Sequence, residues 1–270
     1  MDAEQGPGGR VIGGARMAPG PAPVVGGPPG EAPYLSFRRV VTPEDLEKVF
    51  RLRYQVYVVE RGFERPEDHP AGIERDPFDE VAVHVLCEHR DGIPVGTARL
   101  IPPTPLGFPL EEHCRLDVDP TTLPRDRLGE ISRLAISKEF QRRREDPFNP
   151  APLEEGQAAD TPAPAPGSAP PQRRRNDLVV GLYREIYRVT KERGLTHWYA
   201  AMEDKLMILL RRVGFNFQPI GPYVEYHGRR APFVAAVADL ERFARERAPE
   251  MYREFTAGLT VGPGGAASSA

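Results

Sequence analysis

Residues 129–136 constrain the fold most, because they combine the pattern of a buried strand with two opposite charges. Ile131 and the run 134–136 are apolar, which favours a strand inside a sheet. Glu130 and Arg133 lie in the same segment, and burying a charge is costly unless it is paired. Regular alternation would put these two side chains on opposite faces, whereas a bulge would turn Arg133 toward the side of Glu130. The segment alone predicts either a structural ion pair at a strand end or part of a charged site.

Segments rich in Gly and Pro set the limits of the folded part. Residues 1–33 contain nine Gly and seven Pro, and residues 145–172 contain eight Pro. Such a composition cannot bury enough surface to offset the entropy lost in ordering the backbone. We therefore expect a disordered segment at 1–33, a single domain over 34–257 with a disordered insert at 145–172, and a disordered tail at 258–270.

The overall composition argues against several classes of function. A net charge of −3 gives no reason to expect nucleic-acid binding, and no stretch of 18 apolar residues predicts a membrane span. Cys87 and Cys114 are far apart in the sequence and fit reduced thiols. The six histidines show no metal-ligand spacing. We expect a cytoplasmic protein with no catalytic metal and no tightly bound cofactor.

Alternating helical and strand patterns predict a mixed α/β domain. One helix should begin after the cap Thr42 and run toward Val59, and another should begin after the cap Asn176 and end at Arg193. A strand hairpin should turn at residues 91–92, which read Asp-Gly. The other expected segments are strands at 81–88, 93–101, 196–202, 215–220 and 233–237, helices at 203–213 and 239–247, and an irregular segment at 104–128.

Acidic residues crowd residues 74–79, which read Glu-Arg-Asp-Pro-Phe-Asp. On its own this segment favours an exposed turn. The alternative is a site for a cationic amine, because paired carboxylates hold an ammonium group. Arg53 is expected on a helix, where arginines are usually solvated, whereas Arg99 falls in a strand that we expect in the core.

Four short motifs, taken in order, resemble those of the acyl-homoserine-lactone (autoinducer) synthases and the related bacterial N-acyl amino acid synthases of the GNAT superfamily. The family patterns are R-x-x-V-F, E-x-D-x-[FY]-D, G-x-x-R-L and E-x-S-R-[FL], with an aromatic residue after the first, here Phe63. In this chain they read Arg53-Tyr-Gln-Val-Tyr57, Glu74-Arg-Asp-Pro-Phe-Asp79, Gly96-Thr-Ala-Arg-Leu100 and Glu130-Ile-Ser-Arg-Leu134. The match covers about residues 37–240 and is nearest to the acyltransferases of bacterial PEP-CTERM/exosortase systems.

The resemblance implies a mixed, mostly antiparallel central sheet flanked by helices. It also implies transfer of a fatty acyl group from an acyl carrier protein or acyl-coenzyme A thioester to the amino group of an amino-acid-like acceptor. Glu130 would be the general base, beside Ser132 and Arg133, and a main-chain N–H near residues 132–135 would hold the oxyanion. Trp198 and Phe215 would line an acyl pocket or belong to the plain core. The substrate-binding residues would be Arg53, Tyr57, Phe63, Asp76, Phe78, Asp79 and Arg99.

Two departures from the family patterns bear on the substrates. Tyr57 and Phe63 stand where autoinducer synthases have Phe and Trp, which argues against S-adenosylmethionine as the acceptor. Residues 141–146 lack the glycines with which ordinary acetyltransferases cradle the pyrophosphate of coenzyme A. Their three arginines, Arg142, Arg143 and Arg144, favour an acyl carrier protein as donor, unless they and residues 173–175 are only solubilising charges. The alternatives are an autoinducer synthase that uses S-adenosylmethionine and a catalytically inactive acyl-binding or interaction module.

Overall fold

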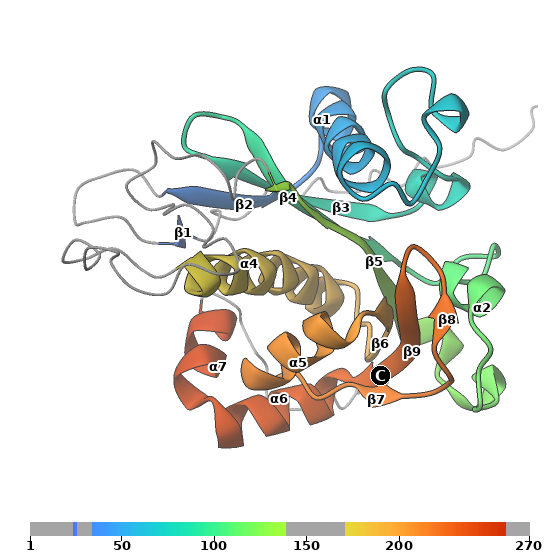
Figure 1. The fold of residues 1–270 in the computed structure, drawn as a ribbon. Coiled ribbons are helices and arrows are strands. Elements are labelled where there is room, and N and C mark those ends of the chain that lie inside the picture. Colours follow the sequence, from blue (N-terminus) through green and yellow to red (C-terminus); the bar gives the residue numbers. More distant parts are fainter. Residues whose placement is uncertain (1–23, 26–33, 139–170, 258–270) are drawn as a thin grey trace, which may run out of the picture.

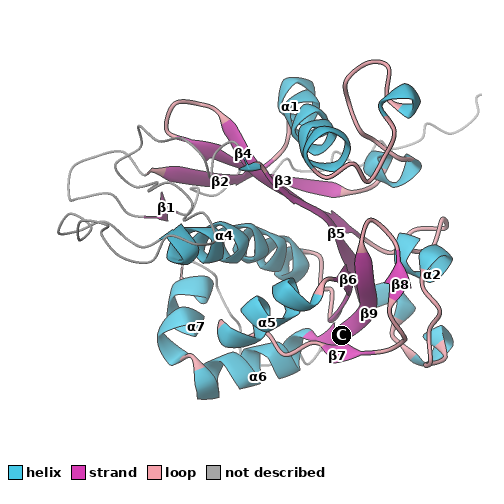
Figure 2. Ribbon diagram, in the orientation of Figure 1, coloured by secondary structure: helices cyan, strands magenta, loops and turns pink. Residues whose placement is uncertain are grey.

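The computed structural model describes residues 24–25, 34–138 and 171–257, whose strands form one sheet with helices on both faces (Figures 1 and 2). The strand order is β1-β2-β3-β4-β5-β6-β9-β7, and β8 pairs with β9. Every pair is antiparallel except β5 with β6. The predicted mixed, mostly antiparallel sheet is confirmed. The strands are β1 (Val24–Val25), β2 (Leu35–Arg39), β3 (Val83–His89), β4 (Pro94–Ile101), β5 (Leu128–Ile136), β6 (His197–Met202), β7 (Gln218–Pro219), β8 (Val224–Glu225) and β9 (Arg229–Ala236).

The helix on the upper face in Figure 1 is α1 (Pro43–Tyr54), and it begins as the sequence predicts. The hydroxyl oxygen of Thr42 accepts a hydrogen bond from the Asp45 main-chain N–H at 3.2 Å, which satisfies one of the free donors of the first turn. The helical path continues as a π-helix, η1 (Gln55–Glu60), and the chain turns at Gly62 with φ of 62°. Two short 3₁₀ segments, η2 (Pro66–Asp68) and η3 (Pro77–Glu80), then lead to β3.

The lower face of the sheet carries α4 (Pro171–Glu192), α5 (Asp204–Arg212), α6 (Val237–Arg247) and α7 (Pro249–Thr256). The main apolar core lies between α4 and the sheet, and the inward positions predicted for α4 are all buried. Trp198 on β6 has no exposed surface, and its indole N–H donates to the hydroxyl oxygen of Thr190 on α4 at 2.9 Å. The inward residues of α4 are Val179, Leu182, Tyr183 and Ile186.

Several predicted boundaries are wrong. Residues 24–25 form β1 against β2 although they fall in the segment 1–33 predicted as disordered, and β2 itself was not predicted. The segment 104–128 contains α2 (Pro109–His113), η4 (Pro120–Thr122) and η5 (Arg125–Arg127). The helix α4 begins at Pro171, so Asn176 lies inside it and residues 171–172 belong to it rather than to the insert. The strand expected at 215–220 is reduced to β7, and α7 and β8 were not foreseen.

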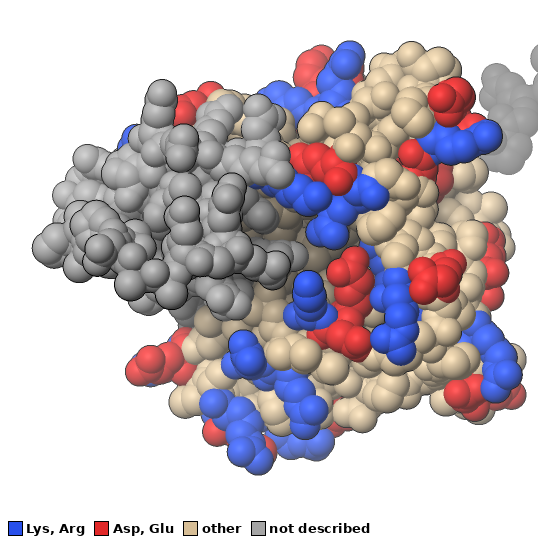
Figure 3. Space-filling model, viewed as in Figure 1, with Lys and Arg blue, Asp and Glu red and all other residues tan. Residues whose placement is uncertain are grey.

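Charged side chains of both signs lie on the face of the molecule seen in Figure 3, and Lys and Arg side chains gather at its lower left. Within the described residues, no helix has both the length and the apolar character required to cross a membrane. Three or more His, Cys, Asp or Glu side chains do not come together as metal ligands anywhere in that part of the chain. The arginines at 142–144 lie outside the described residues.

Candidate active site

A bulge in β5 turns Arg133 out of the regular strand alternation. Arg99 on β4 pairs with Ser132, whereas Thr97 pairs with Ala135, so two residues of β5 oppose one residue of β4. Arg133 has φ of 50°, which is left-handed backbone. Its neighbour Leu134 packs into the lower core together with Ile131, while Arg133 contacts acids on the upper side. The alternative in which a bulge brings Arg133 to the side of Glu130 is confirmed.

Three arginines and three acids from four segments form a network on the upper face of the sheet. Arg53 on α1 contacts Glu74 through Nε, and its Nη1 lies 2.7 Å from Asp79 Oδ1. Arg99 on β4 reaches the Oδ1 atoms of Asp76 and Asp79, both at 2.6 Å. Arg133 on β5 completes the network, with 3.1 Å from Nε to Glu74 Oε1 and 3.0 Å from Nη2 to Asp76 Oδ2.

Burial of this network contradicts the exposed turn favoured for residues 74–79. The side chains of Arg53, Arg99 and Glu74 are at most 1 % exposed, and that of Asp76 is 20 % exposed. Burial raises the pKa of Asp79, but the charges and hydrogen bonds of Arg53 and Arg99 outweigh burial and hold that pKa well below its usual range. The three positive and three negative charges balance, which is the condition under which charges can be buried.

Glu130 on β5 lies near Arg99 and Arg133 of the network, whose charges act on it. It also contacts Leu110 of α2, which belongs to a buried apolar cluster. Glu130 is 3 % exposed. Its Oε2 accepts a hydrogen bond from the Leu110 main-chain N–H at 2.9 Å. Burial raises the pKa of Glu130 to about 7, against the opposing effects of that hydrogen bond and of Arg99 and Arg133. A carboxyl group with this pKa exchanges protons near neutral pH, as a general base must.

The sheet is partly open beside Glu130. The parallel strands β5 and β6 pair only from Leu128 to Glu130, and the rest of β5 has β4 as its only paired neighbour among the described residues. Ser132, Arg133 and Leu134 are accordingly half-buried, although β5 lies in the middle of the sheet. Ser132 Oγ accepts a hydrogen bond from Arg99 Nε at 3.1 Å, which connects this open part of the strand to the ionic network.

Aromatic rings cover the other side of the network. Tyr57 on η1 donates a hydrogen bond from its hydroxyl to the Leu134 main-chain oxygen at 3.1 Å, and its ring lies 5.8 Å from the Arg133 guanidinium. Phe63 lies 6.2 Å from Tyr57, measured between ring centroids, and 5.9 Å from His227 in a stacked arrangement. The predicted residues Arg53, Tyr57, Phe63, Asp76, Asp79, Arg99, Glu130, Ser132 and Arg133 therefore converge on one region.

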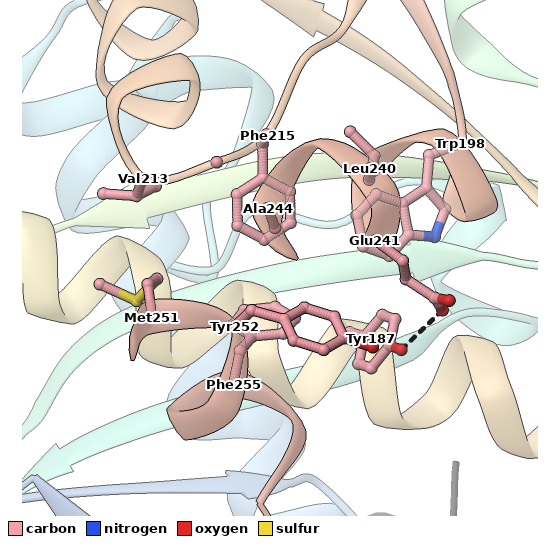
Figure 4. Close-up of a pocket in the computed structure, with 11 residues that line it drawn as sticks. Tyr187, Trp198, Val213, Phe215, Leu240, Glu241, Ala244, Met251, Tyr252 and Phe255 are labelled. Carbon is pink, nitrogen blue, oxygen red and sulfur yellow. Dashed lines mark hydrogen bonds between the residues drawn. The ribbon is translucent and has the colours of Figure 1, made fainter. Parts of the chain in front are cut away.

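Other predicted residues lie elsewhere. Phe78 is buried in the apolar cluster with Phe108, apart from the rings of Tyr57, Phe63 and His227. Trp198 and Phe215 line a small cavity below the sheet, between β6, α6 and α7 (Figure 4). That cavity has a volume of about 20 Å³, which is room for about one water molecule and too little for an acyl chain. Within the structure described, these two residues are part of the core.

Sequence reasoning missed the contribution of β8, β9 and the loop after η1. His227 in the β8–β9 turn has its Nε2 3.1 Å from Glu64 Oε1, and Tyr226 stacks on His227. Burial raises the pKa of Glu64, but His227 and Arg133 outweigh it and lower the pKa to about 2. Residues 64 and 227 are too far apart in the sequence for a local pattern to connect them. Gly228, which marks a turn, was the only available signal.

Known proteins share parts of this sequence pattern and of this fold. Residues 52–146 match the acetyltransferase (GNAT) domain. The N-acyl amino acid synthase FeeM from uncultured soil microbes is similar in structure, with a TM-score of 0.51 and 14% identity over 77% of this chain and 93% of that chain. TofI, solved in a ternary complex with an inhibitor and MTA, also gives a TM-score of 0.51, with 19% identity over 80% of this chain and 98% of that chain. The kinship with PEP-CTERM/exosortase systems stays a prediction. The chain therefore has the fold of FeeM and TofI, and its residues 52–146 match the acetyltransferase (GNAT) domain.

Proposed function

We propose that the protein is an N-acyltransferase that moves a fatty acyl group from a thioester to the amino group of an amino-acid-like acceptor. The observation that carries the proposal is Glu130, a buried carboxyl group with its pKa raised to about 7 beside the open part of β5. The match of residues 52–146 to a GNAT domain and the fold shared with an N-acyl amino acid synthase support the same chemistry.

In the proposed reaction, the acceptor nitrogen attacks the carbonyl carbon of the thioester. A C–N bond forms, the C–S bond breaks, and the thiol leaves. Glu130 takes the proton that the ammonium form of the acceptor must lose, directly or through one water molecule. The Leu110 main-chain N–H holds its Oε2, which fixes the orientation of the carboxyl group for this role. A main-chain N–H beside the bulge at Arg133 would stabilise the oxyanion.

The acceptor amine would first bind near Asp76. Among the three acids of the network, Asp76 has the most exposed side chain, at 20 %, while the other two are nearly enclosed. An ammonium group placed there would gain a charge-assisted hydrogen bond. Arg133, whose side chain is 11 % exposed, is positioned to contact an acceptor carboxylate on the same side. Arg53 and Arg99, which are fully buried, hold the acids in place rather than touch the substrate.

The donor would approach along the part of β5 that β6 leaves unpaired. An extended chain with amide groups can add to an exposed strand edge through main-chain hydrogen bonds. We propose an acyl carrier protein as the donor, because Arg142, Arg143 and Arg144 follow β5 in the sequence and would attract an acidic protein. Acyl-coenzyme A is the alternative donor.

The direct test supplies the purified protein with acyl carrier protein or coenzyme A thioesters of several acyl lengths and a mixture of amino acids. The proposal predicts an N-acyl amino acid by mass spectrometry together with equimolar free thiol. Reversal of Arg142, Arg143 and Arg144 to Glu should weaken transfer from acyl carrier protein more than from coenzyme A. An equal loss of transfer rate with both donors would contradict a role for these arginines in binding acyl carrier protein.

Two alternatives give different products in the same assay. An autoinducer synthase would require S-adenosylmethionine and release methylthioadenosine as a lactone forms. An inactive acyl-binding module would bind the acyl chain but consume no thioester with any amine. Either result would replace the proposed function.

A further inference from the structure

The exposed side of α5 carries cations that have no acidic partner in the part of the chain that the structure describes. Lys205, Arg211 and Arg212 are all exposed, and none of them forms an ion pair there. The nearby Arg229 and Arg230, by contrast, reach Asp204 and Glu203 at 3.6 and 3.8 Å. The Lys and Arg side chains at the lower left of Figure 3 lie over the region of α5, α6 and α7 in Figure 1.

Ile208 lies among these cations on the surface of the helix. It follows Lys205 by three residues and precedes Arg211 and Arg212 by three and four, and side chains at such spacings are neighbours on a helix. Ile208 is 46 % exposed, whereas Leu210, on the opposite side of the helix, is fully buried in the core. One side of α5 therefore combines an exposed aliphatic side chain with three positive charges.

The stability of the helix does not explain this combination. Arg211 and Arg212 lie in the last turn of α5, where the helix dipole favours a positive charge. Lys205 lies in the first turn, where the dipole disfavours one. An exposed isoleucine adds little to the core, and its β-branched side chain makes it a poorer helix former than Leu or Lys. An external partner accounts for these residues better.

The β8–β9 hairpin adds an aromatic ring and a fourth cation beside the first turn of α5. Tyr223, just before β8, is 41 % exposed, and its hydroxyl contacts Asp204. The Arg229 guanidinium lies 4.0 Å from the centroid of the Tyr223 ring. Because Asp204 precedes Ile208 by four residues, the hairpin residues lie on the same side of α5 as Ile208.

We propose that this side of α5 and the adjoining hairpin residues dock on an anionic lipid bilayer. The docking surface consists of Lys205, Ile208, Arg211, Arg212, Tyr223 and Arg229. Lipid phosphates attract the cations, and the aliphatic side chain enters the boundary between head groups and acyl chains. Long Lys and Arg side chains keep their charges among the head groups when the helix lies close to the acyl chains, and tyrosine is favoured at the same depth.

A bilayer fits this surface better than an acidic protein does. An acidic protein would satisfy the positive charges, but it would also need an apolar pocket that matches Ile208. A bilayer accepts both kinds of side chain without a matching shape. Binding strength at such a surface grows with the buried apolar area and with the number of cations, so we expect weak, reversible and salt-sensitive docking.

The docking does not depend on the reaction, because binding to lipid requires no substrate. The proposed function would give it a use. An N-acyl amino acid combines a fatty chain with a charged group, and its chain gains free energy for each CH₂ group that enters a bilayer. A docked enzyme would release this product where it partitions.

Flotation of the full chain with lipid vesicles tests the inference, without acyl donor or acceptor. The vesicles contain phosphatidylglycerol mixed with phosphatidylcholine, or phosphatidylcholine alone. The double variant Arg211→Gln/Arg212→Gln removes two charges, and Ile208→Gln removes the aliphatic group with a residue that suits a helix. The matched control is Arg51→Gln/Arg65→Gln, which changes the net charge equally at two exposed positions on α1 and in the loop after η1.

The wild type should float with the anionic vesicles but not with the neutral ones, and added salt should release it. The double variant at 211 and 212 should weaken the apparent affinity by about 10- to 30-fold and Ile208→Gln by about 3- to 10-fold, with the control within about 2-fold. No binding to anionic vesicles, or equal weakening in the control, would overturn the inference. Binding that both surface variants retain in full would also overturn it, because another part of the chain would then make the contact.

A fluorescent label tests which side of the molecule meets the lipid. Cys87 and Cys114 are buried, and burial raises the pKa of both thiols, so a thiol-reactive dye should label the Ile208→Cys variant at position 208. The emission of an environment-sensitive dye there should shift to shorter wavelength when anionic vesicles are added. The same dye on Arg51→Cys should not respond. Identical behaviour of the two labelled variants would contradict the docking surface.

Acyl-transfer assays on the same variants separate this inference from the proposed function. Vesicle binding without any acyl transfer would support the docking surface and reject the proposed function. Acyl transfer without vesicle binding would do the reverse. If the double variant at 211 and 212 slows transfer from acyl carrier protein and no vesicle binding occurs, the surface binds an acidic protein and the lipid inference is wrong.

Discussion

Above the sheet, α1 covers arginines and carboxylates, whereas below it α4 covers aromatic and aliphatic side chains. Both faces are fully buried at their centres, as Arg53 and Trp198 illustrate with no exposed surface in either side chain. The lower face gains free energy with every apolar group that it buries. The upper face must recover the cost of desolvating six charges through their mutual contacts, so it contributes little net stability. The charges on the upper face are best explained by a function in binding or catalysis, because the other face of the same sheet is packed with apolar side chains.

The upper face should be the more sensitive to loss of a single partner. Arg53→Met would leave Glu74 and Asp79 buried without their main counter-charge. We expect the free energy of unfolding to fall by about 3–5 kcal/mol, measured by urea denaturation at pH 7. The exposed Arg51→Met on the same helix, whose partner Glu47 is also exposed, is the control and should change stability by less than about 1 kcal/mol. Comparable losses in the two variants would mean that the network is not a buried unit.

Glu130→Gln separates function from stability on the upper face. If Glu130 is the base, turnover should fall by about 10² or more, or about 2.7 kcal/mol in the barrier. The exposed Glu112→Gln on α2 should leave turnover unchanged.

The same substitution should raise stability at alkaline pH. A carboxyl group whose pKa is raised on folding to about 7 stabilises the native state only while it is protonated, so that contribution is lost as pH rises through about 7. Glutamine avoids the loss, and Glu130→Gln should be more stable than the wild type by about 1–3 kcal/mol at pH 8 and equal to it at pH 4. Equal stability at both pH values would contradict a raised pKa.

The lower face should be sensitive to added volume instead. A Cβ atom at Gly181 on α4 would lie 2.3 Å from Cζ of Phe37, a fully buried ring on β2. Gly181→Ala should therefore destabilise the protein by about 1–3 kcal/mol, although alanine is the better helix former. Phe37→Leu should relieve the clash, so the double variant should be more stable than the sum of the two single changes predicts. Strict additivity would mean that α4 shifts to accommodate the methyl group.

Removal of a single hydrogen bond should give the smallest difference in stability loss between the two faces. Tyr57→Phe removes the bond to the Leu134 oxygen at the edge of the site, and we expect a loss of about 1 kcal/mol. Thr190→Val leaves the fully buried indole N–H of Trp198 without its acceptor, which should cost about 1–3 kcal/mol. Thermal unfolding of both variants tests this order of stability losses. A larger loss of stability in Tyr57→Phe than in Thr190→Val would contradict it.

The lower face and the sheet could largely be predicted from the sequence, because their signals are local. The spacing of Leu182, Tyr183 and Ile186 identifies a buried helix face, and the Asp-Gly pair at 91–92 identifies the hairpin turn, where Gly92 has φ of 76°. Helix and strand ends were less predictable: α4 begins five residues before the expected cap Asn176, because other residues can continue a helix through a good capping residue.

The upper face could be predicted only where a motif joined distant segments. Nothing local to Arg53 distinguishes it from a solvated arginine, since its partners lie more than 20 residues further along the chain. The bulge at Arg133 could be foreseen as an option because a charged residue interrupts an apolar strand. The contact of His227 with Glu64 could not be foreseen, because it depends on the fold that brings the β8–β9 turn next to the loop after η1.

The pH dependence of kcat/KM for amide formation by the wild type tests the central claim most directly. If the upper face is an acyl-transfer site with Glu130 as its base, the rate should rise through an inflection near pH 7 as that carboxyl group loses its proton. The inflection should disappear in Glu130→Gln and persist in Glu112→Gln. An inflection near pH 7 that survives in Glu130→Gln, or a wild-type rate that does not change between pH 6 and 8, would contradict the account.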